Sequence, residues 1–463
     1  MAKAVPTPLS VAVIGGGWAG CAAAMELARA GHVVTVHEAA RTLGGRARKV
    51  ERDGTVLDNG QHILLGAYQE TLRLLKLAGQ DPQALILELP LQMRYPDGSG
   101  GMDFVTPRWP APLHLAWALL RAKGLARADK VALMRFSSAM RWMGWQLYND
   151  CTVSELLERF DQTDRLIALM WRPLCLAALN TPPERASARV FVNVLRDSLG
   201  ARRRSASDML IPKTNLSALF PEAAARYVAS HGGLVKLGVK VESLQALDDG
   251  RWQLDSADTH DRVVLATSGS QAASLLASTG APAVDDVIAQ LQAFTYEAIS
   301  TCYLQYDAAL RLELPFYALV DAPAQAHWGQ FVFDRGQLDA RQAGLLAVVI
   351  SASADAAAQG HAALVHAVAA QLAQALRMPQ LAQPVWTQVI TEKRATFACT
   401  PDLLRPANAT GLAGLVLAGD YTAGDYPATI EAAVRSGVQA ASLVSQIKTH
   451  ASKASPHIVP MCR

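Results

Sequence analysis

A glycine-rich turn between two apolar runs, at the start of the chain, constrains the fold more than any other feature. The apolar run from Val11 to Ile14 predicts a buried parallel strand, and Gly15-Gly-Gly17-Trp-Ala-Gly20 follows it. The Ala- and Leu-rich stretch behind the glycines predicts a helix that ends near Gly31. A second apolar run over 33–38 completes a βαβ unit.

Each glycine of this turn has a separate physical role. Gly15 lets the strand turn, Gly17 removes the Cβ that would block a pyrophosphate, and Gly20 lets helix and strand pack closely. Glu38 ends the second strand, where an acid accepts hydrogen bonds from a ribose. An ordinary glycine turn is the alternative, but the strand, helix, second strand and acid all have the spacing of a nucleotide site. Three neighbours are expected in the same site: Trp18, Ala19 and Ala39.

A second glycine segment, Arg41-Thr-Leu-Gly44-Gly45-Arg46, follows the acid at once. It resembles the second glycine motif of FAD-dependent amine oxidases and carotenoid desaturases. The resemblance implies that FAD is the cofactor and that these residues pass beside its pyrophosphate and flavin.

The polar segment Asp58-Asn-Gly60-Gln61-His62 has two possible interpretations. From pattern alone it could be a turn that caps the following helix. In the resembling family this part of the chain lies along the isoalloxazine ring, which would put His62 near the reactive face.

The C-terminal segment supplies a third match. A predicted strand over 415–418 leads into Gly419-Asp420 and then, beyond a loop, into a helix that starts near Ala428-Thr429-Ile430. This is similar to the last FAD-binding segment of the plant-type phytoene desaturases and amine oxidases. There the aspartate binds the ribityl-phosphate end, and the helix N-terminus faces the flavin pyrimidine, where its dipole stabilises negative charge. By the same resemblance, Val239 or Val241 would lie near the adenine, and Val241 is included in the predicted site.

The segment from Trp109 to Trp145 has an unusual composition. Four tryptophans alternate with six Arg and Lys residues, Arg108 directly precedes the segment, and Asp129 is the only acid. Basic helices with aromatic residues lie in membrane interfaces, which favours a membrane-bound segment. The alternative is a helical subdomain with tryptophans in its core and a solvated basic face.

The stretch from Trp171 to Ser187 is apolar on nearly every side and ends at a proline pair. It predicts a buried helix and turn whose small Ala residues are suited to line a tunnel, although core packing alone would also explain it. Residues from about 294 to 390 alternate strand-like runs with an Ala-rich helix, which predicts an antiparallel sheet facing a cavity.

The bulk composition excludes several classes of protein. The net charge of +3 with 51% hydrophobic residues gives no reason to expect nucleic-acid binding. The six cysteines form no CxxC pair, so neither a disulfide framework nor a metal site is expected. No run has the length and apolar purity of a membrane-spanning helix. We therefore expect a cytoplasmic protein, held peripherally at the inner face of the membrane.

The predicted fold class is α/β. A Rossmann-type FAD-binding domain of the amine oxidase type is interleaved with an antiparallel-sheet substrate domain and a helical, membrane-facing subdomain. The FAD-binding parts are expected at 1–80, 213–285 and 396–448, the substrate parts at 81–108 and 286–395, the helical subdomain at 109–212, and a flexible tail at 449–463.

Taken together, the motifs resemble the squalene-associated branch of this family, the hydroxysqualene dehydroxylases of bacterial hopanoid biosynthesis. The resemblance implies that reduced FAD delivers hydride to an allylic carbon of a C30 isoprenoid whose hydroxyl leaves as water. A general acid is then needed, and His62 and Asp425 are the candidates. The alternatives are a carotenoid-type desaturase or isomerase and a non-catalytic isoprenoid-binding flavoprotein scaffold. The electron donor that reduces the flavin is not indicated by the sequence.

Overall fold

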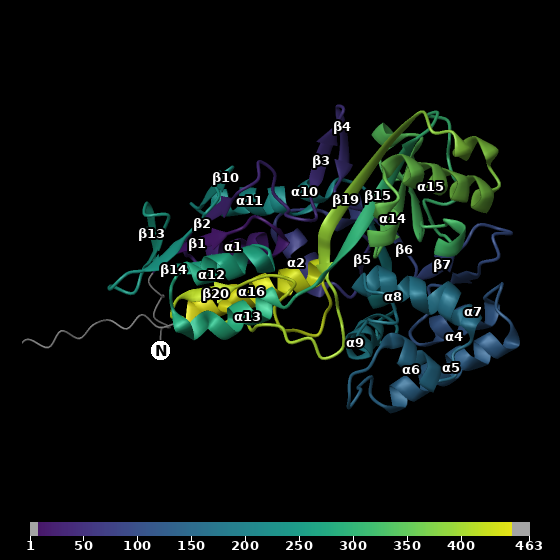
Figure 1. Ribbon diagram of the computed structural model, residues 1–463, viewed down its shortest axis with the longest axis horizontal. Helices are drawn as coiled ribbons and strands as arrows, with labels where there is room; N and C mark the ends of the chain where they lie inside the picture. The colour runs from purple at the N-terminus through teal and green to yellow at the C-terminus, as the bar shows by residue number, and fades with distance from the viewer. Residues whose placement is uncertain (1–7, 447–463) are drawn as a thin grey trace, which may run out of the picture.

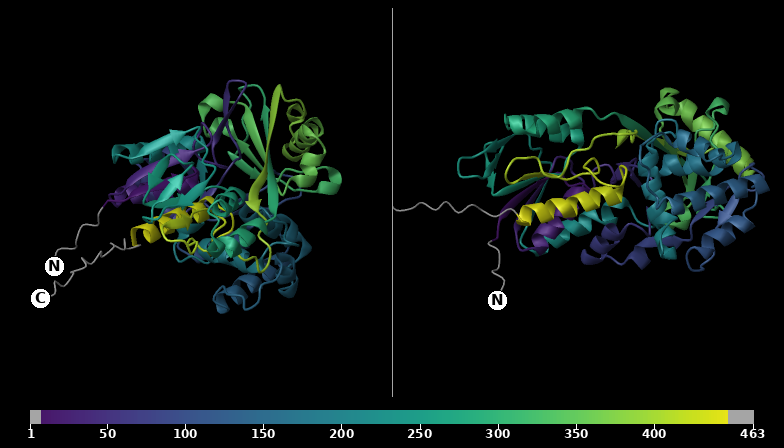
Figure 2. Two further views of the ribbon diagram at one scale, coloured as in Figure 1. Left: turned by 60° about the vertical axis from the view of Figure 1, so that its left-hand side comes forward. Right: turned by 90° about the horizontal axis from the view of Figure 1, so that it is seen from below.

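The computed structural model describes residues 8–446, so the predicted tail at 449–463 lies outside the described residues. A parallel sheet with its helices forms one end of the molecule (Figure 1). An antiparallel sheet and a group of short helices form the other end, and the view from below in Figure 2 shows the same division. The long strands β15 and β19 run between the two ends.

The parallel sheet has five strands in the order β10-β2-β1-β14-β20. Its strands are β1 (Ser10–Ile14), β2 (Val33–Glu38), β10 (Leu234–Leu237), β14 (Arg262–Leu265) and β20 (Leu415–Leu417). Side chains alternate between its two faces, so Val11 and Val13 pack toward helix α1 while Ala12 and Ile14 face the opposite side.

Helices α1 (Trp18–Arg29), α11 (Pro221–Ser230) and α16 (Ile430–Gln446) cover the first face. A Cβ on Gly437 of α16 would lie 2.2 Å from the carbonyl oxygen of Ala19, so only glycine allows this close helix contact. On the opposite face lies an antiparallel three-stranded sheet of β11 (Leu244–Ala246), β12 (Trp252–Leu254) and β13 (Asp258–His260). Helices α12 (Gly269–Ala277) and α13 (Asp285–Gln292) complete this part.

The antiparallel sheet has the strand order β16-β17-β18-β15-β19. Its strands are β15 (Tyr296–Gln305), β16 (Phe316–Ala318), β17 (Phe331–Asp334), β18 (Leu345–Ser351) and β19 (Trp386–Phe397). Helices α14 (Ala354–Ala358) and α15 (His361–Leu376) pack on its outer face, and Phe316, Phe331 and Phe333 line a cavity on the inner face. The predicted combination of a Rossmann-type α/β unit with an interleaved antiparallel sheet is therefore confirmed.

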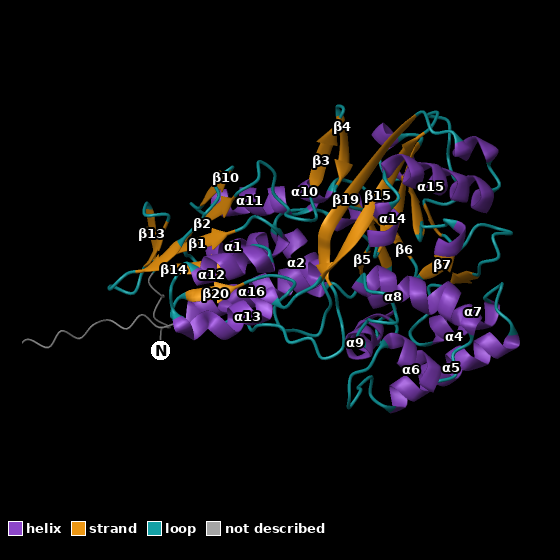
Figure 3. Ribbon diagram, viewed as in Figure 1, coloured by secondary structure: helices purple, strands orange, loops and turns teal. Residues whose placement is uncertain are grey.

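The remaining elements are small sheets and helices, and α4 to α7 (residues 113–166) form a helical group at the end of the molecule that holds the antiparallel sheet (Figure 3). Small antiparallel sheets pair β3 (Lys49–Arg52) with β4 (Thr55–Asp58), β9 (Met209–Pro212) with both β5 (Leu64–Leu65) and β6 (Ile86–Leu89), and β7 (Gln92–Arg94) with β8 (Asp103–Val105). The further helices are α2 (Gln69–Leu77), α3 (Pro82–Leu85), α4 (Leu113–Arg121), α5 (Arg127–Trp142), α6 (Val153–Arg159), α7 (Asp164–Leu166), the π-helical turn η1 (Ile167–Trp171), α8 (Arg172–Leu179), α9 (Ala188–Ser198) and α10 (Leu216–Leu219). Within the described residues there are also six short 3-10 turns: 204–207, 282–284, 323–325, 335–337, 340–342 and 379–382.

Candidate functional site: two joined cavities

A cavity of about 500 Å³ lies at the carboxyl ends of β1 and β2, where α1 begins. We call it the nucleotide cavity. Most residues of the sequence-predicted site line it: Gly15, Gly17, Trp18, Ala19, Glu38, Ala39, Gly44, Gly45, Arg46, His62, Val241, Gly419, Asp420, Ala428, Thr429 and Ile430. Segments that are distant in sequence, including the N-terminal glycine turn and the C-terminal segment from Gly419, thus line the same cavity.

The glycines give this cavity its shape. Gly15 has a φ of +109°, and a Cβ there would lie 2.5 Å from the carbonyl oxygen of Ala266. A Cβ on Gly20 would lie 1.9 Å from the carbonyl oxygen of Gly15, so Gly20 packs behind the turn rather than lining the cavity. At Gly17 the nearest atom would be Gly45 Cα at 3.8 Å, which leaves open space beside the N-terminus of α1. An anionic group fits there, because the helix N-terminus offers free N–H groups and positive potential.

Glu38 lines the nucleotide cavity and binds two backbone N–H groups beside it. Its carboxylate accepts hydrogen bonds from the backbone N–H groups of Gly16 at 2.6 Å and Ala40 at 2.7 Å. Each carboxylate oxygen keeps lone pairs for a further donor, such as a ribose hydroxyl. The backbone N–H of Gly44 donates to the carbonyl oxygen of Gly16 at 2.9 Å, which joins the second glycine segment to the first.

Arg46 and Asp420 form an ion pair across the cavity. The Arg46 guanidinium donates to Asp420 Oδ1 at 2.6 Å and to the carbonyl oxygen of Ala395 at 2.8 Å. The Asp420 side chain is only 7% exposed, so Arg46 is the charge that compensates it. The pair connects the segment after β2 to the loop between β20 and α16.

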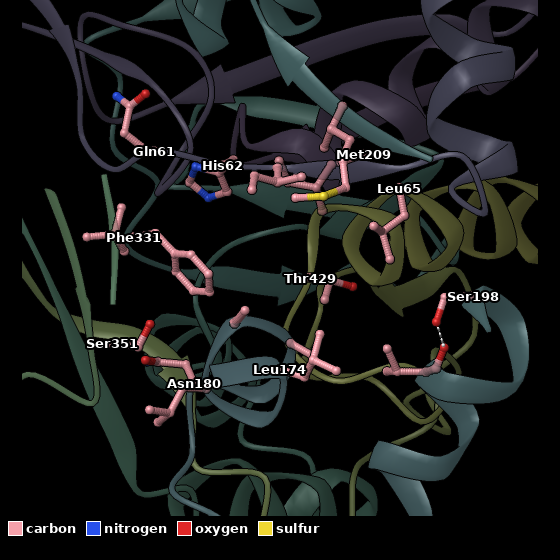
Figure 4. A pocket seen from close by; sticks show the side chains of 18 of the residues that line it. Gln61, His62, Leu65, Leu174, Asn180, Ser198, Met209, Phe331, Ser351 and Thr429 are labelled. Atoms are coloured by element: carbon pink, nitrogen blue, oxygen red, sulfur yellow. Dashed lines mark hydrogen bonds between the residues drawn. The ribbon is translucent and has the colours of Figure 1, made fainter. Parts of the chain in front are cut away.

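A second cavity, largely apolar, opens from the first between the antiparallel sheet and α8. Figure 4 shows His62, Phe331, Leu174 and Thr429 around this apolar cavity. Seven residues line both cavities: Arg46, His62, Glu392, Ala395, Ala428, Thr429 and Ile430. A molecule in the apolar cavity would therefore meet a cofactor in the nucleotide cavity at this junction.

His62 is the imidazole at the junction. Its Nδ1 lies 3.0 Å from the carbonyl oxygen of Gly60, and because a carbonyl only accepts, Nδ1 carries the hydrogen of this bond. Burial lowers the pKa of His62 below its ordinary value, and the charge of Arg46 lowers it further, although the Gly60 bond opposes this. The other ring nitrogen, Nε2, is therefore the atom that can bind or release a proton.

Four predicted residues do not line the nucleotide cavity. Gly20 lies behind the turn, Arg41 is exposed, and Gly60 and Gln61 line the apolar cavity instead. The Gln61 amide donates to the Tyr303 hydroxyl at 2.8 Å and accepts from the Arg335 guanidinium at 2.9 Å.

The placement predicted for Asp425 beside the flavin is wrong. Asp425 lines neither cavity, its side chain is 68% exposed, and it forms an ion pair with Arg196 at 3.4 Å. The loop after Asp420 turns outward before α16 begins, so the motif carries this carboxylate to the surface.

The sequence prediction missed Glu392. This residue lies on β19 and lines both cavities, and its carboxylate accepts from the Asn59 side chain at 3.3 Å. No local motif marks it, because its position depends on the pairing of β19 with β15 across the sheet. It is the one carboxylate among the seven junction residues.

The comparisons with known proteins agree with this geometry. The model of the family "Flavin containing amine oxidoreductase" matches residues 18–445. A hydroxysqualene dehydroxylase from Rhodopseudomonas palustris is 31% identical over 94% of this chain and 98% of its own length, and one from Sinorhizobium fredii is 28% identical with the same coverage. A solved oxidoreductase from Methanosarcina mazei superposes with a TM-score of 0.70 at 15% identity, covering 94% of this chain and all of that chain, which supports the fold alone.

Proposed function

Because this chain belongs to the family of flavin-containing amine oxidoreductases and is an FAD-dependent oxidoreductase, we propose that it converts hydroxysqualene to squalene in hopanoid biosynthesis. The similarity to hydroxysqualene dehydroxylases along nearly the whole chain supports this substrate. The observation that carries the proposal is the junction itself, where an apolar cavity meets the nucleotide cavity beside His62.

The residues of the nucleotide cavity fit FAD. The space beside Gly17 accommodates a pyrophosphate, the Glu38 carboxylate is placed for ribose hydroxyls, and the loop of Asp420 reaches the start of α16. When bound in reduced form, FAD supplies a hydride. The overall reaction replaces a C–O bond by a C–H bond, oxidises the flavin and releases water.

The protein must protonate the allylic hydroxyl and keep bulk water away. We assign the proton to Nε2 of His62, since Nδ1 is held by the carbonyl of Gly60. Loss of water from the protonated substrate produces an allylic cation. Aromatic ring faces in the apolar cavity can stabilise this cation, and five phenylalanines line the cavity: Phe104, Phe191, Phe316, Phe331 and Phe333. An enclosed apolar site favours capture of the cation by hydride over capture by water.

The direction of electron flow separates this proposal from a carotenoid-type desaturase. Anaerobic addition of hydroxysqualene to the photoreduced enzyme should reoxidise one flavin per substrate. Bleaching of the oxidised flavin by a polyene, with no response of the reduced enzyme to hydroxysqualene, would instead indicate a desaturase. Binding without any change in the flavin spectrum would indicate a scaffold.

The first prediction concerns the ribose contact. Glu38→Ala should weaken FAD binding roughly 10- to 100-fold, because a hydrogen bond to a charged group contributes about 1.5 to 3 kcal/mol. Glu38→Gln is the matched control, since it keeps one acceptor oxygen and should lose less affinity. Equilibrium titration of the apoprotein with FAD measures both, and an unchanged dissociation constant for Glu38→Ala would remove this role.

We also propose that the protein binds the cytoplasmic face of the membrane through α4 and α5. Leu113, Trp117 and Leu120 are 60%, 40% and 70% exposed and follow one another at helical spacing on α4. On α5, Val131 and Met134 are about half exposed, and Trp142 at its end is 89% exposed. Basic side chains surround them, with the Arg121 guanidinium 5.8 Å from the Trp117 ring centroid. Among residues 8–446, no helix is both long enough and apolar enough to cross a bilayer.

Reversing the charges of Arg121, Lys123 and Arg127 to Glu should weaken binding to anionic vesicles by more than about 100-fold, because each basic residue near such lipid contributes about 1 kcal/mol and each added Glu is repelled. A matched control reverses Arg52, Arg226 and Arg311, which are also exposed but lie outside α4 and α5. Vesicle co-sedimentation at low and high salt measures the effect. Equal binding of the two triple variants would refute the assigned surface.

A further inference from the structure

A second cluster of ligating side chains lies beside the nucleotide cavity, between the parallel sheet and the small sheet of β11, β12 and β13, and one of its members, His37, also lines that cavity. It consists of His37 on β2 with Asp258 and His260 on β13, and one ligand atom from each lies within 4.8 Å of the other two. Within residues 8–446 it is the only group of three or more His, Cys, Asp or Glu side chains gathered in this way. We propose that it binds a divalent transition-metal ion, Zn²⁺ in the first place.

The two histidines have unused nitrogens. His37 is 3% exposed, and both of its ring nitrogens lack a hydrogen-bond partner within the structure described. His260 is 7% exposed, and its Nε2 is equally without a partner. Buried polar atoms are normally satisfied, so three unpaired imidazole nitrogens in one place need an explanation. A coordinated cation would satisfy one nitrogen of each ring.

The chemistry of these side chains fits Zn²⁺. Neutral imidazole is the commonest metal ligand among side chains, and both histidines of the cluster are buried. Two imidazoles and one carboxylate with a fourth, open position are a common zinc ligand set. The hydroxyl of Ser10 lies 2.9 Å from His260 Nδ1 and would orient this ring, leaving Nε2 for the metal.

The positions require only a local adjustment. Ligand atoms around a tetrahedral zinc ion lie roughly 3.4 Å apart, as follows from bonds of about 2.0 to 2.1 Å. Because the three ligand atoms lie within 4.8 Å of one another, each separation has to close by at most about 1.4 Å. Asp258 can make most of this movement, because its side chain is 42% exposed whereas the histidines are packed.

Lys236 is the competing cation. It lies directly opposite His37 in the β10–β2 register, and its ammonium donates to Asp258. Because the Lys236 side chain is 37% exposed, its ammonium group can rotate toward the solvent when a metal ion binds the Asp258 carboxylate. Its positive charge must still weaken metal binding, so removing it should increase the affinity. Adventitious binding elsewhere on the protein would not respond in this way.

A bound ion would tie β2, which ends at Glu38, to β13 of the small sheet. The cluster lies on the side of β2 away from α1. His37 also lines the nucleotide cavity, but none of the three ligands lines the apolar cavity. Because the ligands lie outside the apolar cavity, where the substrate would bind, metal loading should leave the reaction chemistry unchanged while it stabilises this half of the molecule.

The test uses the FAD-loaded full-length protein, stripped with a chelator and titrated with Zn²⁺ by calorimetry and with Co²⁺ by visible absorption. We expect one tight site in the wild type, at least tenfold weaker binding in Asp258→Asn and His260→Ala, and about tenfold tighter binding in Lys236→Gln. His366→Ala, on an exposed histidine of α15, is the matched control and should bind as the wild type does.

Absence of a tight site in the wild type, or unchanged affinity in both Asp258→Asn and Lys236→Gln, would overturn the proposal. These two variants decide the result even if His260→Ala fails to fold, because both side chains are partly exposed. Flavin absorbance confirms that each variant retains its fold.

Discussion

His62→Ala should slow squalene formation by roughly 10²- to 10⁴-fold while FAD stays bound, because a positioned general acid typically contributes that factor. His62 is the only imidazole among the residues that line both cavities, and its Nδ1 is occupied by the Gly60 carbonyl. Single-turnover rates of the reduced enzyme, with flavin content measured in the same samples, check this. Asp425→Asn is the matched control and should react at the wild-type rate, since Asp425 is exposed and lines neither cavity.

The pH dependence follows from the same assignment. The pKa of His62 is lowered from its ordinary value of 6.5 by burial, so the imidazole is mostly neutral above that pH. The reactive form is the protonated one, so the single-turnover rate should rise about tenfold per pH unit as the pH falls from 8 toward 6. This rise should vanish in His62→Gln. If His62→Ala keeps both FAD and the wild-type rate, the acid lies elsewhere, and Glu392→Gln becomes the decisive variant.

The second large effect concerns access to the junction. Ala178→Trp should lower kcat/KM for hydroxysqualene by roughly 100-fold, about 2.7 kcal/mol, because the added side chain competes with the substrate for space. Ala178 lies on α8 and lines the apolar cavity but not the nucleotide cavity, so an indole there occupies the space of the substrate. FAD affinity should not change.

Ala363→Trp is the control for adding a large side chain, because Ala363 is exposed on α15 and lines neither cavity. Both variants should show the same thermal stability within a few degrees when FAD is bound. Wild-type kinetics in Ala178→Trp would mean that the substrate does not use the apolar cavity.

The nucleotide half of the site could be predicted because its signals are local. The turn from Gly15 to Gly20 and the acid Glu38 belong to one βαβ unit, whose geometry follows from short-range spacing. The second glycine segment joins the first through the bond from Gly44 to Gly16, which the sequence order already suggests. Each of these residues lies where the motif predicts.

The junction could be predicted only in part, because long-range pairing builds it. Glu392 reaches both cavities through the register of β19 on β15, which no local pattern reveals. Gln61 belongs to a predicted segment, yet Tyr303 and Arg335, both distant in sequence, hold its side chain at the apolar cavity. Asp425 follows a matching motif but lies in a loop whose path the motif does not determine.

The tryptophan-rich segment shows why composition could not decide between core and surface. On α5, Phe136 and Met140 are buried in the core, whereas Val131 and Met134 on the same helix are about half exposed. Trp145 packs partly against the core, and Trp142 is almost fully exposed. The segment therefore contains both core side chains and an exposed apolar and basic face, and the average composition concealed this division; membrane binding by that face stays a proposal.

Product analysis tests the central claim most directly. Wild-type enzyme, reduced under anaerobic conditions and incubated with hydroxysqualene, should yield squalene in an amount equal to the reduced FAD consumed. In D₂O, where the exchangeable N–H hydrogens of reduced FAD are replaced by deuterium, the product should carry one deuterium at the carbon that bore the hydroxyl. Recovery of unchanged hydroxysqualene from enzyme with full FAD content, or of products with additional double bonds, would contradict the proposed function.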